Sequence, residues 1–126
     1  MKANGEKILV VDDDIQSTEI MRCILENYGY QVITNNHPGN ALKKYQEAKN
    51  DINLVIADYQ MPIMDGLDFA SAILSINPDI PIILVTSKFF DSKIIFEAGL
   101  KGYLKKPIST QPFIDLCQRA ILDHSI

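Results

Sequence analysis

Five short runs of β-favouring apolar residues alternate with longer stretches in which apolar and polar residues follow a helical spacing. The first, third and fourth runs are continuously apolar, which is typical of strands covered on both faces. The second and fifth runs are shorter and more mixed, which favours edge strands or less buried ones. We therefore predict strands at Lys7–Val11, Gln31–Thr34, Asn53–Ala57, Pro81–Val85 and Gly102–Leu104.

The stretches that follow these runs predict five helices. Pro38 suits the first turn of the second helix, and Ser109 or Thr110 suits the cap of the fifth. Gly29 and Gly99 stand where the first and fourth helical patterns stop. The predicted helices are Ile15–Tyr28, Pro38–Ala48, Gly66–Ile76, Asp91–Ala98 and Ser109–Asp123.

This strand–helix alternation, repeated five times, predicts an α/β fold. Parallel strands joined by right-handed crossovers place helices on both faces of one sheet. We expect a single (βα)5 doubly wound domain over residues 1–126, with a five-stranded parallel sheet in the flavodoxin-like order 2-1-3-4-5. The length of 126 residues suits one domain with a genuine core and leaves little room for a second.

The two cysteines carry no recognisable metal or redox pattern. Cys23 and Cys117 lie far apart and form no CxxC pair, so we predict small core residues on helices rather than a disulfide. In the first helix, the spacing of Ile20, Cys23, Ile24 and Tyr28 predicts the buried face.

Charge and hydropathy narrow the class of protein. The net charge of -4 argues against nucleic-acid binding by this domain, because phosphate contacts need a basic face. No apolar run approaches the length of a membrane span, and nothing before the first strand resembles a signal peptide. We therefore expect a cytoplasmic protein without a membrane partner.

Chemistry-bearing side chains follow four of the five predicted strands. Asp58 comes directly after a buried run, where an ionised carboxylate is costly unless something uses or neutralises it. Asp12 and Asp13 follow the first run, Thr86 the fourth and Lys106 the fifth. Because parallel strands end at one edge of the sheet, where ligands bind, we expect these five side chains to lie together.

Three carboxylates and one ammonium group suit phosphoryl chemistry. Clustered carboxylates repel one another, and a hard divalent cation with oxygen ligands, Mg²⁺ or Mn²⁺, removes that cost. Phosphoryl transfer needs an in-line nucleophile and positive charge against the transferring oxygens. Asp58 is the candidate nucleophile, forming an acyl phosphate, while Lys106 and the Thr86 hydroxyl are placed to contact the phosphoryl oxygens.

These residues carry a family resemblance over nearly the whole chain. The sequence resembles a response-regulator receiver domain of two-component (phosphorelay) signalling. The matching segments, each weak alone and strong in order, are Ile8–Asp14, Val55–Gly66, Val85–Ser87 and Glu97–Pro107.

The resemblance implies particular roles at matching positions. Asp58 would accept phosphate from a phosphohistidine on a histidine kinase or a histidine phosphotransfer protein. Asp13, Asp58 and the main-chain carbonyl of Gln60 would bind Mg²⁺, with Asp12 acting largely through a bound water. The domain would phosphorylate itself and lose the phosphate slowly, so it is not expected to be a turnover enzyme.

The resemblance also implies a switch. Lys106 and Thr86 would contact the phosphoryl group, and Thr86 would vacate space that the ring of Tyr103 enters. A downstream protein would bind the surface made by the fourth helix, the fifth strand and the fifth helix. Receivers usually carry a cis bond at the step that corresponds to Lys106-Pro107. Read alone, Tyr103 would more often be a packed or half-exposed strand residue than a switch.

The chain departs from the family pattern between the fourth strand and the fourth helix. Ser87 stands where receivers usually carry alanine or glycine, and the 20 residues from Thr86 to Lys106 are a couple fewer than usual. The shortened loop contains Phe89 and Phe90, where polar residues are more usual. We expect one of these rings to fill the core and the other to be an exposed contact for a partner.

Two other functions share parts of this pattern. A haloacid-dehalogenase-like phosphatase also uses a strand-end aspartate, but it needs a second acid two residues later, where this chain has Gln60. A pseudo-receiver would bind a partner without taking phosphate; such modules typically lose the acidic pair, the acceptor or the lysine. The pattern does not say whether the domain acts alone or belongs to a larger regulator.

Overall fold

All five predicted strands and all five predicted helices are present. The computed structural model describes residues 3–125, with side chains described as far as residue 123. The strands are β1 (Lys7–Val11), β2 (Gln31–Asn35), β3 (Ile52–Asp58), β4 (Ile82–Thr86) and β5 (Gly102–Lys105). The helices are α1 (Ile15–Asn27), α2 (Pro38–Ala48), α3 (Gly66–Ile76), α4 (Ser92–Glu97) and α5 (Thr110–Ser125).

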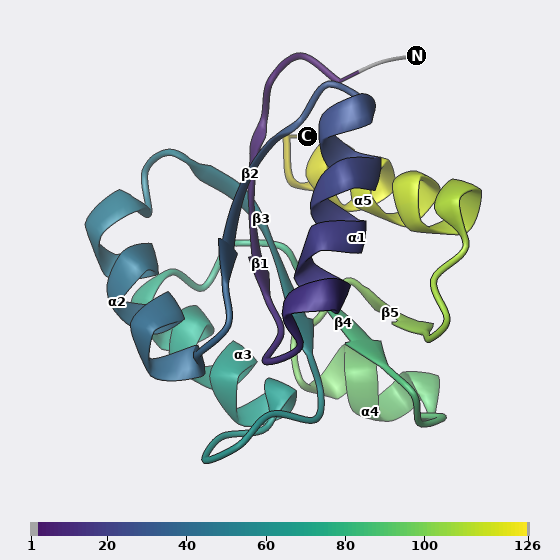
Figure 1. Ribbon diagram of the computed structural model, residues 1–126. Helices are drawn as coiled ribbons and strands as arrows, with labels where there is room; N and C mark the ends of the chain where they lie inside the picture. The colour runs from purple at the N-terminus through teal and green to yellow at the C-terminus, as the bar shows by residue number, and fades with distance from the viewer. Residues whose placement is uncertain (1–2, 126) are drawn as a thin grey trace.

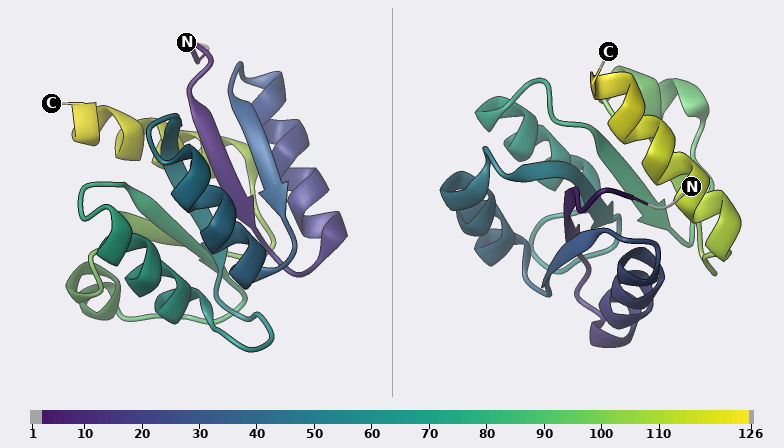
Figure 2. Two further views of the ribbon diagram at one scale, coloured as in Figure 1. Left: turned by 90° about the vertical axis from the view of Figure 1, so that its left-hand side faces the viewer. Right: turned by 90° about the horizontal axis from the view of Figure 1, so that it is seen from above.

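The strands form one parallel sheet in the order β2-β1-β3-β4-β5, as predicted. The two mixed runs, β2 and β5, are the edge strands. Helices α1 and α5 cover one face of the sheet, and α2, α3 and α4 pack on the other (Figures 1 and 2). This arrangement explains why β1, β3 and β4 are continuously apolar, because both of their faces are buried.

Alternate residues of the central strands feed two separate cores. Leu9 and Val55 point into the core shared with α2, α3 and α4, whereas Ile8 and Leu54 point into the core shared with α1 and α5. This is the period of two that a strand imposes on its side chains. Each fully buried aliphatic side chain contributes roughly 1.5–3 kcal/mol. The two cores therefore hold the strand ends in a rigid frame.

The buried face of α1 differs from the prediction. Met21 and Leu25 are fully buried, whereas Ile20 and Cys23 are exposed, and Ile24 is half-buried. Apolar residues occupy consecutive positions along this helix, so periodicity alone left the stripe ambiguous by one position. Contact with the sheet selects the Met21 stripe, and the prediction that Cys23 is a core residue is wrong.

The other cysteine and the helix ends agree with the prediction. Cys117 is buried in α5, and burial raises the pKa of its thiol to about 12. Both cysteines are free thiols. Gly29 and Gly99 follow the ends of α1 and α4 with φ values of 103° and 85°, a region that favours glycine. Within residues 3–125, no helix is long and apolar enough to cross a bilayer.

Candidate functional site

The site lies at the carboxyl edge of the sheet. Asp12 directly follows β1, Asp58 is the last residue of β3, Thr86 is the last residue of β4, and Lys106 directly follows β5. The strand register sets Asp58 beside Val85 in β4. Because the flanking strand residues are fully buried, the frame leaves these side chains little freedom to move apart.

The three acidic side chains meet as predicted. Asp12, Asp13 and Asp58 each offer a carboxylate oxygen, and these atoms lie within 4.8 Å of one another. Asp12 and Asp58 are buried, with 0% and 5% of their surface exposed, whereas Asp13 is exposed. Two buried carboxylates this close together cost free energy in their ionised form unless positive charge is supplied.

Lys106 supplies part of that charge. Its Nζ atom lies 2.9 Å from Asp12 Oδ2 and 3.2 Å from Asp58 Oδ1. It also donates a hydrogen bond to Ser17 Oγ on α1, at 3.4 Å. Burial lowers the pKa of Lys106, but the hydrogen bond to Asp12 and the charges of both carboxylates outweigh it and raise the pKa above its usual value. Lys106 therefore stays protonated and is shared by two acids.

One ammonium group does not balance this many carboxylates. Burial raises the pKa of Asp58 to about 6, and the negative charge of Asp12 adds to that rise, while Lys106 opposes it. The negative charge of Asp13 makes a smaller contribution that also raises the pKa of Asp58. The pocket consequently holds excess negative charge, which a divalent cation would neutralise.

The donor set fits a hard divalent cation. Carboxylate oxygens from Asp12, Asp13 and Asp58 are the ligands that Mg²⁺ and Mn²⁺ prefer, and the exposed side of Asp13 leaves room for coordinated water. The predicted part of the Gln60 main-chain carbonyl in such a site stays a prediction. Asp14, in contrast, caps α1 by accepting a hydrogen bond from the Gln16 amide.

Thr86 is held by the loop that follows it. The side chain is fully buried, and its hydroxyl oxygen accepts a hydrogen bond from the Lys88 amide at 3.0 Å. The Thr86 carbonyl accepts from the Lys106 amide at 2.7 Å. This second bond links the ends of β4 and β5, so a displacement of Thr86 would also move the loops that follow these two strands.

A side-chain bridge joins two of the loops around Asp58. Ser87 Oγ donates to Gln60 Oε1 at 3.0 Å, which connects the loop after β3 to the loop after β4. The sequence identified Ser87 as unusual for a receiver and Gln60 as standing where a phosphatase needs an acid, but only the fold shows that they touch. The Ser17 contact to Lys106 was also missed, because no local pattern marks a serine on α1 as a neighbour of residue 106.

The two phenylalanines of the short loop have separate fates, as predicted. Phe90 packs against the core, whereas 82% of the Phe89 surface is exposed. The Phe90 ring lies edge-on to Tyr59, at 4.8 Å between centroids, and to Tyr103, at 6.0 Å. The Phe90 amide also donates to the Tyr103 hydroxyl at 3.3 Å. Tyr103 itself is half-buried. Through the Phe90 ring it is connected to Tyr59, the residue that follows Asp58.

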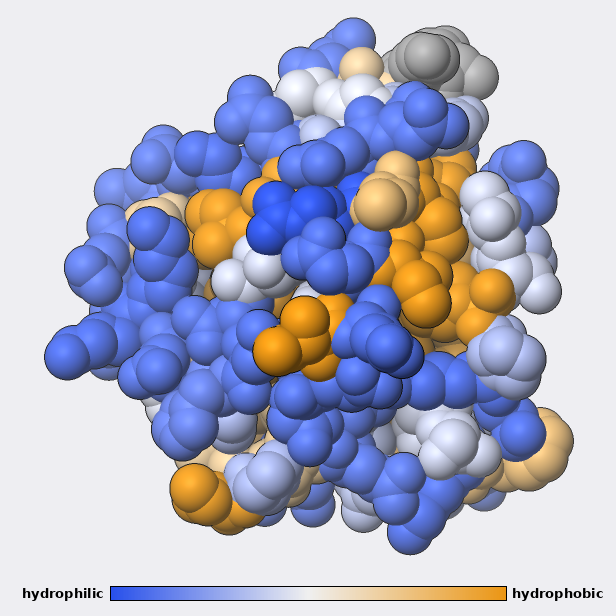
Figure 3. All heavy atoms as spheres, viewed as in Figure 1, coloured by the Kyte–Doolittle hydropathy of each residue, from blue (hydrophilic) through white to orange (hydrophobic). Residues whose placement is uncertain are grey.

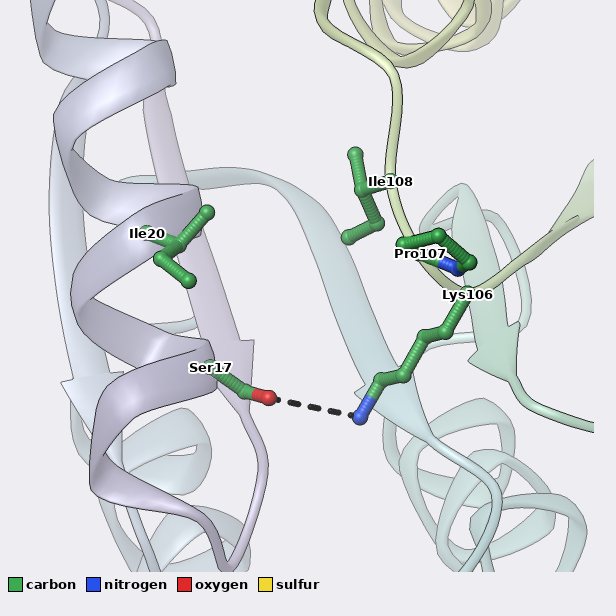
Figure 4. A pocket seen from close by; sticks show the side chains of 5 residues that line it. All are labelled: Ser17, Ile20, Lys106, Pro107 and Ile108. Carbon is green, nitrogen blue, oxygen red and sulfur yellow. Dashed lines mark hydrogen bonds between the residues drawn. The ribbon is translucent and has the colours of Figure 1, made fainter.

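A groove opens beside Lys106. The Lys106-Pro107 bond is cis, as predicted, and the segment that follows runs past α1. Ile20 on α1 and Ile108 after β5 flank a hollow of about 440 Å³ that also contacts Ser17 (Figure 4). Figure 3 shows hydrophobic side chains gathered between α1 and α5 in a largely hydrophilic surface. The apolar groove therefore leads to the charged pocket.

Comparison with known proteins agrees with this geometry. The family model of the response regulator receiver domain matches residues 8–118. The transcriptional regulatory protein ZraR of Klebsiella oxytoca is 37% identical over 83% of this chain, which spans 24% of that protein. The regulator PhoP of Bacillus subtilis is 34% identical over 96% of this chain, which spans 50% of that protein.

Solved structures extend the likeness to three dimensions. A receiver domain from Clostridium thermocellum superimposes with a TM-score of 0.89 and is 29% identical, over 94% of this chain and 96% of that one. The chemotaxis protein CheY4 of Vibrio cholerae gives a TM-score of 0.84 at 30% identity, over 92% and 98%. Together with the acidic edge described above, these matches show that the chain belongs to the response regulator receiver domain family.

Proposed function

We propose that this receiver domain takes a phosphoryl group onto Asp58 in a reaction that depends on Mg²⁺ or Mn²⁺. The observation that carries the proposal is the position of Asp58: a buried carboxylate at the end of β3, beside two further acids and 3.2 Å from the Lys106 ammonium. The phosphodonor is a phosphohistidine on a histidine kinase or a histidine phosphotransfer protein. We infer both these partners and a cytoplasmic location from membership of the receiver domain family.

The transfer balances without a further reactant. An Asp58 carboxylate oxygen forms the new P–O bond while the P–N bond to the donor imidazole breaks, and the leaving nitrogen keeps the electron pair. Lys106 donates to Asp12 and Asp58, and its ammonium group would donate a hydrogen bond to a phosphoryl oxygen as negative charge develops there. A divalent cation bound by Asp12, Asp13 and Asp58 would neutralise the remaining charge on the transferring group.

The phosphorylated domain would act as a switch rather than as a turnover enzyme. Two residues beyond Asp58 stands Gln60, which cannot protonate a leaving group as a phosphatase of the haloacid-dehalogenase type requires. A phosphoryl group adds charge close to −2 and strong hydrogen-bond acceptors. The Thr86 hydroxyl would turn toward those acceptors and give up its bond from the Lys88 amide.

The proposed readout is the surface made by α4, β5 and α5. Movement of Thr86 would free space for Tyr103, whose hydroxyl is otherwise bonded to the Phe90 amide. The domain would then redistribute between two conformations, and a downstream protein would bind one of them more tightly. The net charge of -4 supports a protein partner rather than nucleic acid for this domain.

The direct test is chemical modification of Asp58. Wild-type protein and Asp58→Asn are incubated with acetyl phosphate and Mg²⁺, and intact mass is measured; Asp51→Asn, a change at an exposed acid, is the matched control. We expect a one-phosphoryl adduct in the wild type and the control, and none in Asp58→Asn. An unmodified wild type would favour a pseudo-receiver, and steady turnover of p-nitrophenyl phosphate would favour a phosphatase.

The switch is tested separately with fluorotyrosine NMR. The Tyr103 signal is assigned by its loss in Tyr103→Phe, and beryllofluoride with Mg²⁺ replaces the phosphoryl group. We expect the Tyr103 signal to shift in the wild type and in Thr86→Ser, but not in Thr86→Ala. A full Tyr103 shift in Thr86→Ala would refute the coupling while leaving the phosphorylation of Asp58 untouched.

A further inference from the structure

The surface around α4 and β5 combines exposed aromatic rings with lysines. Phe89 and Phe96 expose 82% and 81% of their surfaces, far more than packed aromatic residues do. The stretch 87–105 contains four lysines against two acids, a local charge of +2 in a chain of net charge -4. We call this surface the basic aromatic face; its members are Phe89, Phe96, Lys88, Lys93, Lys101 and Lys105, all exposed.

The lysines of this face are not neutralised by neighbouring acids. Among the described residues, ion pairs involve Arg22 and Lys106 and none of the four lysines of the face. Of the two acids nearby, Asp91 caps α4, where it accepts from the Lys93 amide, and Glu97 forms no ion pair with a described lysine. Lys105 instead lies over the Phe89 ring, with Nζ 4.6 Å from the centroid. The positive charge is thus available to a partner.

A hollow lies within the same face. It has a volume of about 340 Å³ and is bounded by Phe96 on α4, by Lys101, and by Tyr103 on β5. Ile95 and Leu100, both almost fully buried, form its apolar floor. At about 30 Å³ per water, the space corresponds to roughly ten waters, which is enough for a large apolar side chain. Lys101, which borders the hollow, would then pair with an acidic residue that neighbours this apolar side chain in the partner.

We propose that the basic aromatic face binds an acidic amphipathic segment of a partner protein. One large apolar side chain of the segment enters the hollow beside Phe96, and carboxylates pair with Lys101 and Lys105. The proposal rests on the proposed function in one respect, that phosphorylation of Asp58 alters the affinity through Tyr103, which lines the hollow. The charge preference itself follows from the lysines alone.

The spacing of the lysines restricts the segment. Lys101 and Lys105 are four positions apart along an extended stretch, about 13 Å at the rise of a parallel strand. A helix covers that length in about nine residues. Positions nine apart lie on opposite sides of a helix, however, so an acidic helix should present its carboxylates about seven or eight positions apart, where both lie near one face, on either side of the apolar side chain.

The test uses designed peptides as probes. A fluorescent helical peptide with a leucine and phenylalanine stripe carries glutamates about seven positions apart, before and after the stripe on the same helix face. Its partner peptide has lysine at every glutamate. Fluorescence anisotropy then gives the affinity of each peptide for the unmodified protein and for the protein with beryllofluoride and Mg²⁺.

We expect the acidic peptide to bind at least about tenfold more tightly than the basic one, with an affinity that falls as salt rises. The double variant Lys101→Glu/Lys105→Glu should lose that preference and favour the basic peptide. Phe96→Ser should weaken both peptides. Lys44→Glu/Lys49→Glu, which makes the same charge change at exposed positions at α2, is the control and should behave as the wild type.

Each result separates this proposal from the others. Equal affinity for the two peptides, or no binding in either state, would overturn it even if Asp58 is phosphorylated. Binding of the acidic peptide without any Asp58 adduct would support the face and reject the proposed function. A concentration-dependent dimer in light scattering that the Lys101→Glu/Lys105→Glu change abolishes would assign the face to a second copy and overturn it. Circular dichroism melts confirm that each variant is folded.

Discussion

The Asp58 pocket and the basic aromatic face lie on neighbouring loops but are built in opposite ways. In the pocket, Asp12 and Asp58 are buried at the ends of the central strands β1 and β3, and both are paired with Lys106. On the face, Phe96 on the six-residue helix α4 and Phe89 in the loop before it expose most of their surfaces. Within the described residues, no buried side-chain nitrogen or oxygen atom lacks a hydrogen bond.

The contrast separates chemistry from readout. A reacting group must be held in one geometry, which the two cores achieve at the strand ends. A surface that reports a change must have two arrangements of similar free energy, and a short helix with few buried residues suits that need. Phe90 connects the regions, because its ring contacts Tyr59 beside Asp58 and Tyr103 on β5.

The largest expected effect tests the rigidity of the pocket. A Cβ atom at Gly66 would clash with the Asp58 carbonyl oxygen and would lie 2.8 Å from Tyr59 Cα, so the backbone itself must move. We expect Gly66→Ala to lower the free energy of unfolding by about 3 kcal/mol or more, measured by urea denaturation.

Gly39→Ala is the matched control, because the added methyl group there meets only the side chain of the exposed His37. It should change stability by no more than about 0.5 kcal/mol. If the two variants are equally stable, the pocket is less constrained than the contrast requires.

The second prediction concerns the excess negative charge of the pocket. In metal-free protein, folded Asp58 keeps its proton up to a pKa of about 6, whereas the unfolded chain releases it near 3.8. The folded state therefore binds more protons between these values, and stability falls as the pH rises through them. The full loss amounts to as much as about 3 kcal/mol.

Urea denaturation in EDTA at about pH 4 and about pH 7 measures this dependence. Asp58→Asn should remove it and should be more stable than the wild type at the higher pH. Added Mg²⁺ should restore stability to the wild type there. A wild type that gains stability from about pH 4 to about pH 7 relative to Asp58→Asn would contradict the assigned charge balance.

The third prediction compares the two phenylalanines that join the regions. Phe90→Ala removes a ring that packs between Tyr59 and Tyr103, so we expect a loss of about 2 kcal/mol and a weaker Tyr103 response to beryllofluoride. Phe89→Ala removes an exposed ring whose contact is the Lys105 ammonium, and should cost at most about 0.5–1 kcal/mol. Equal losses would show that the rings are not divided between core and surface.

The smallest effect is a gain in the loop between β3 and α3. Ile63 has a φ of 75° and exposes 90% of its surface, in a turn where the Met64 amide donates to the Pro62 carbonyl. A β-branched residue is strained there, so Ile63→Gly should raise the free energy of unfolding by about 0.5–1 kcal/mol. Thermal melts measure the change. Ile63→Val keeps the branched side chain and should not raise the free energy of unfolding.

Most of the pocket could be predicted because it depends on where strands stop. Asp12, Asp58, Thr86 and Lys106 each follow an apolar run, and parallel strands bring such positions to one edge. The cis bond before Pro107 was predicted from family likeness rather than from any pattern of polarity. The roles of these residues in metal binding and phosphoryl transfer stay predictions.

The errors arose where several solutions satisfy one pattern. Along α1, Ile20 and Met21 belong to adjacent stripes with equal helical spacing, and only contact with the sheet buries Met21 and exposes Cys23. The Ser87 to Gln60 hydrogen bond joins loops 27 positions apart, and no local signal pairs a serine with a glutamine.

Local physical chemistry along the chain was enough for the elements, the parallel sheet and the edge at which the acids gather, since strand and helix periods and turn residues act over a few neighbours. The helix face that packs, the contact of Ser17 with Lys106, the Phe90 bridge and the basic aromatic face were decided only by tertiary structure. These depend on distances between residues far apart in sequence, and packing fixes those distances only when the two cores close on the sheet.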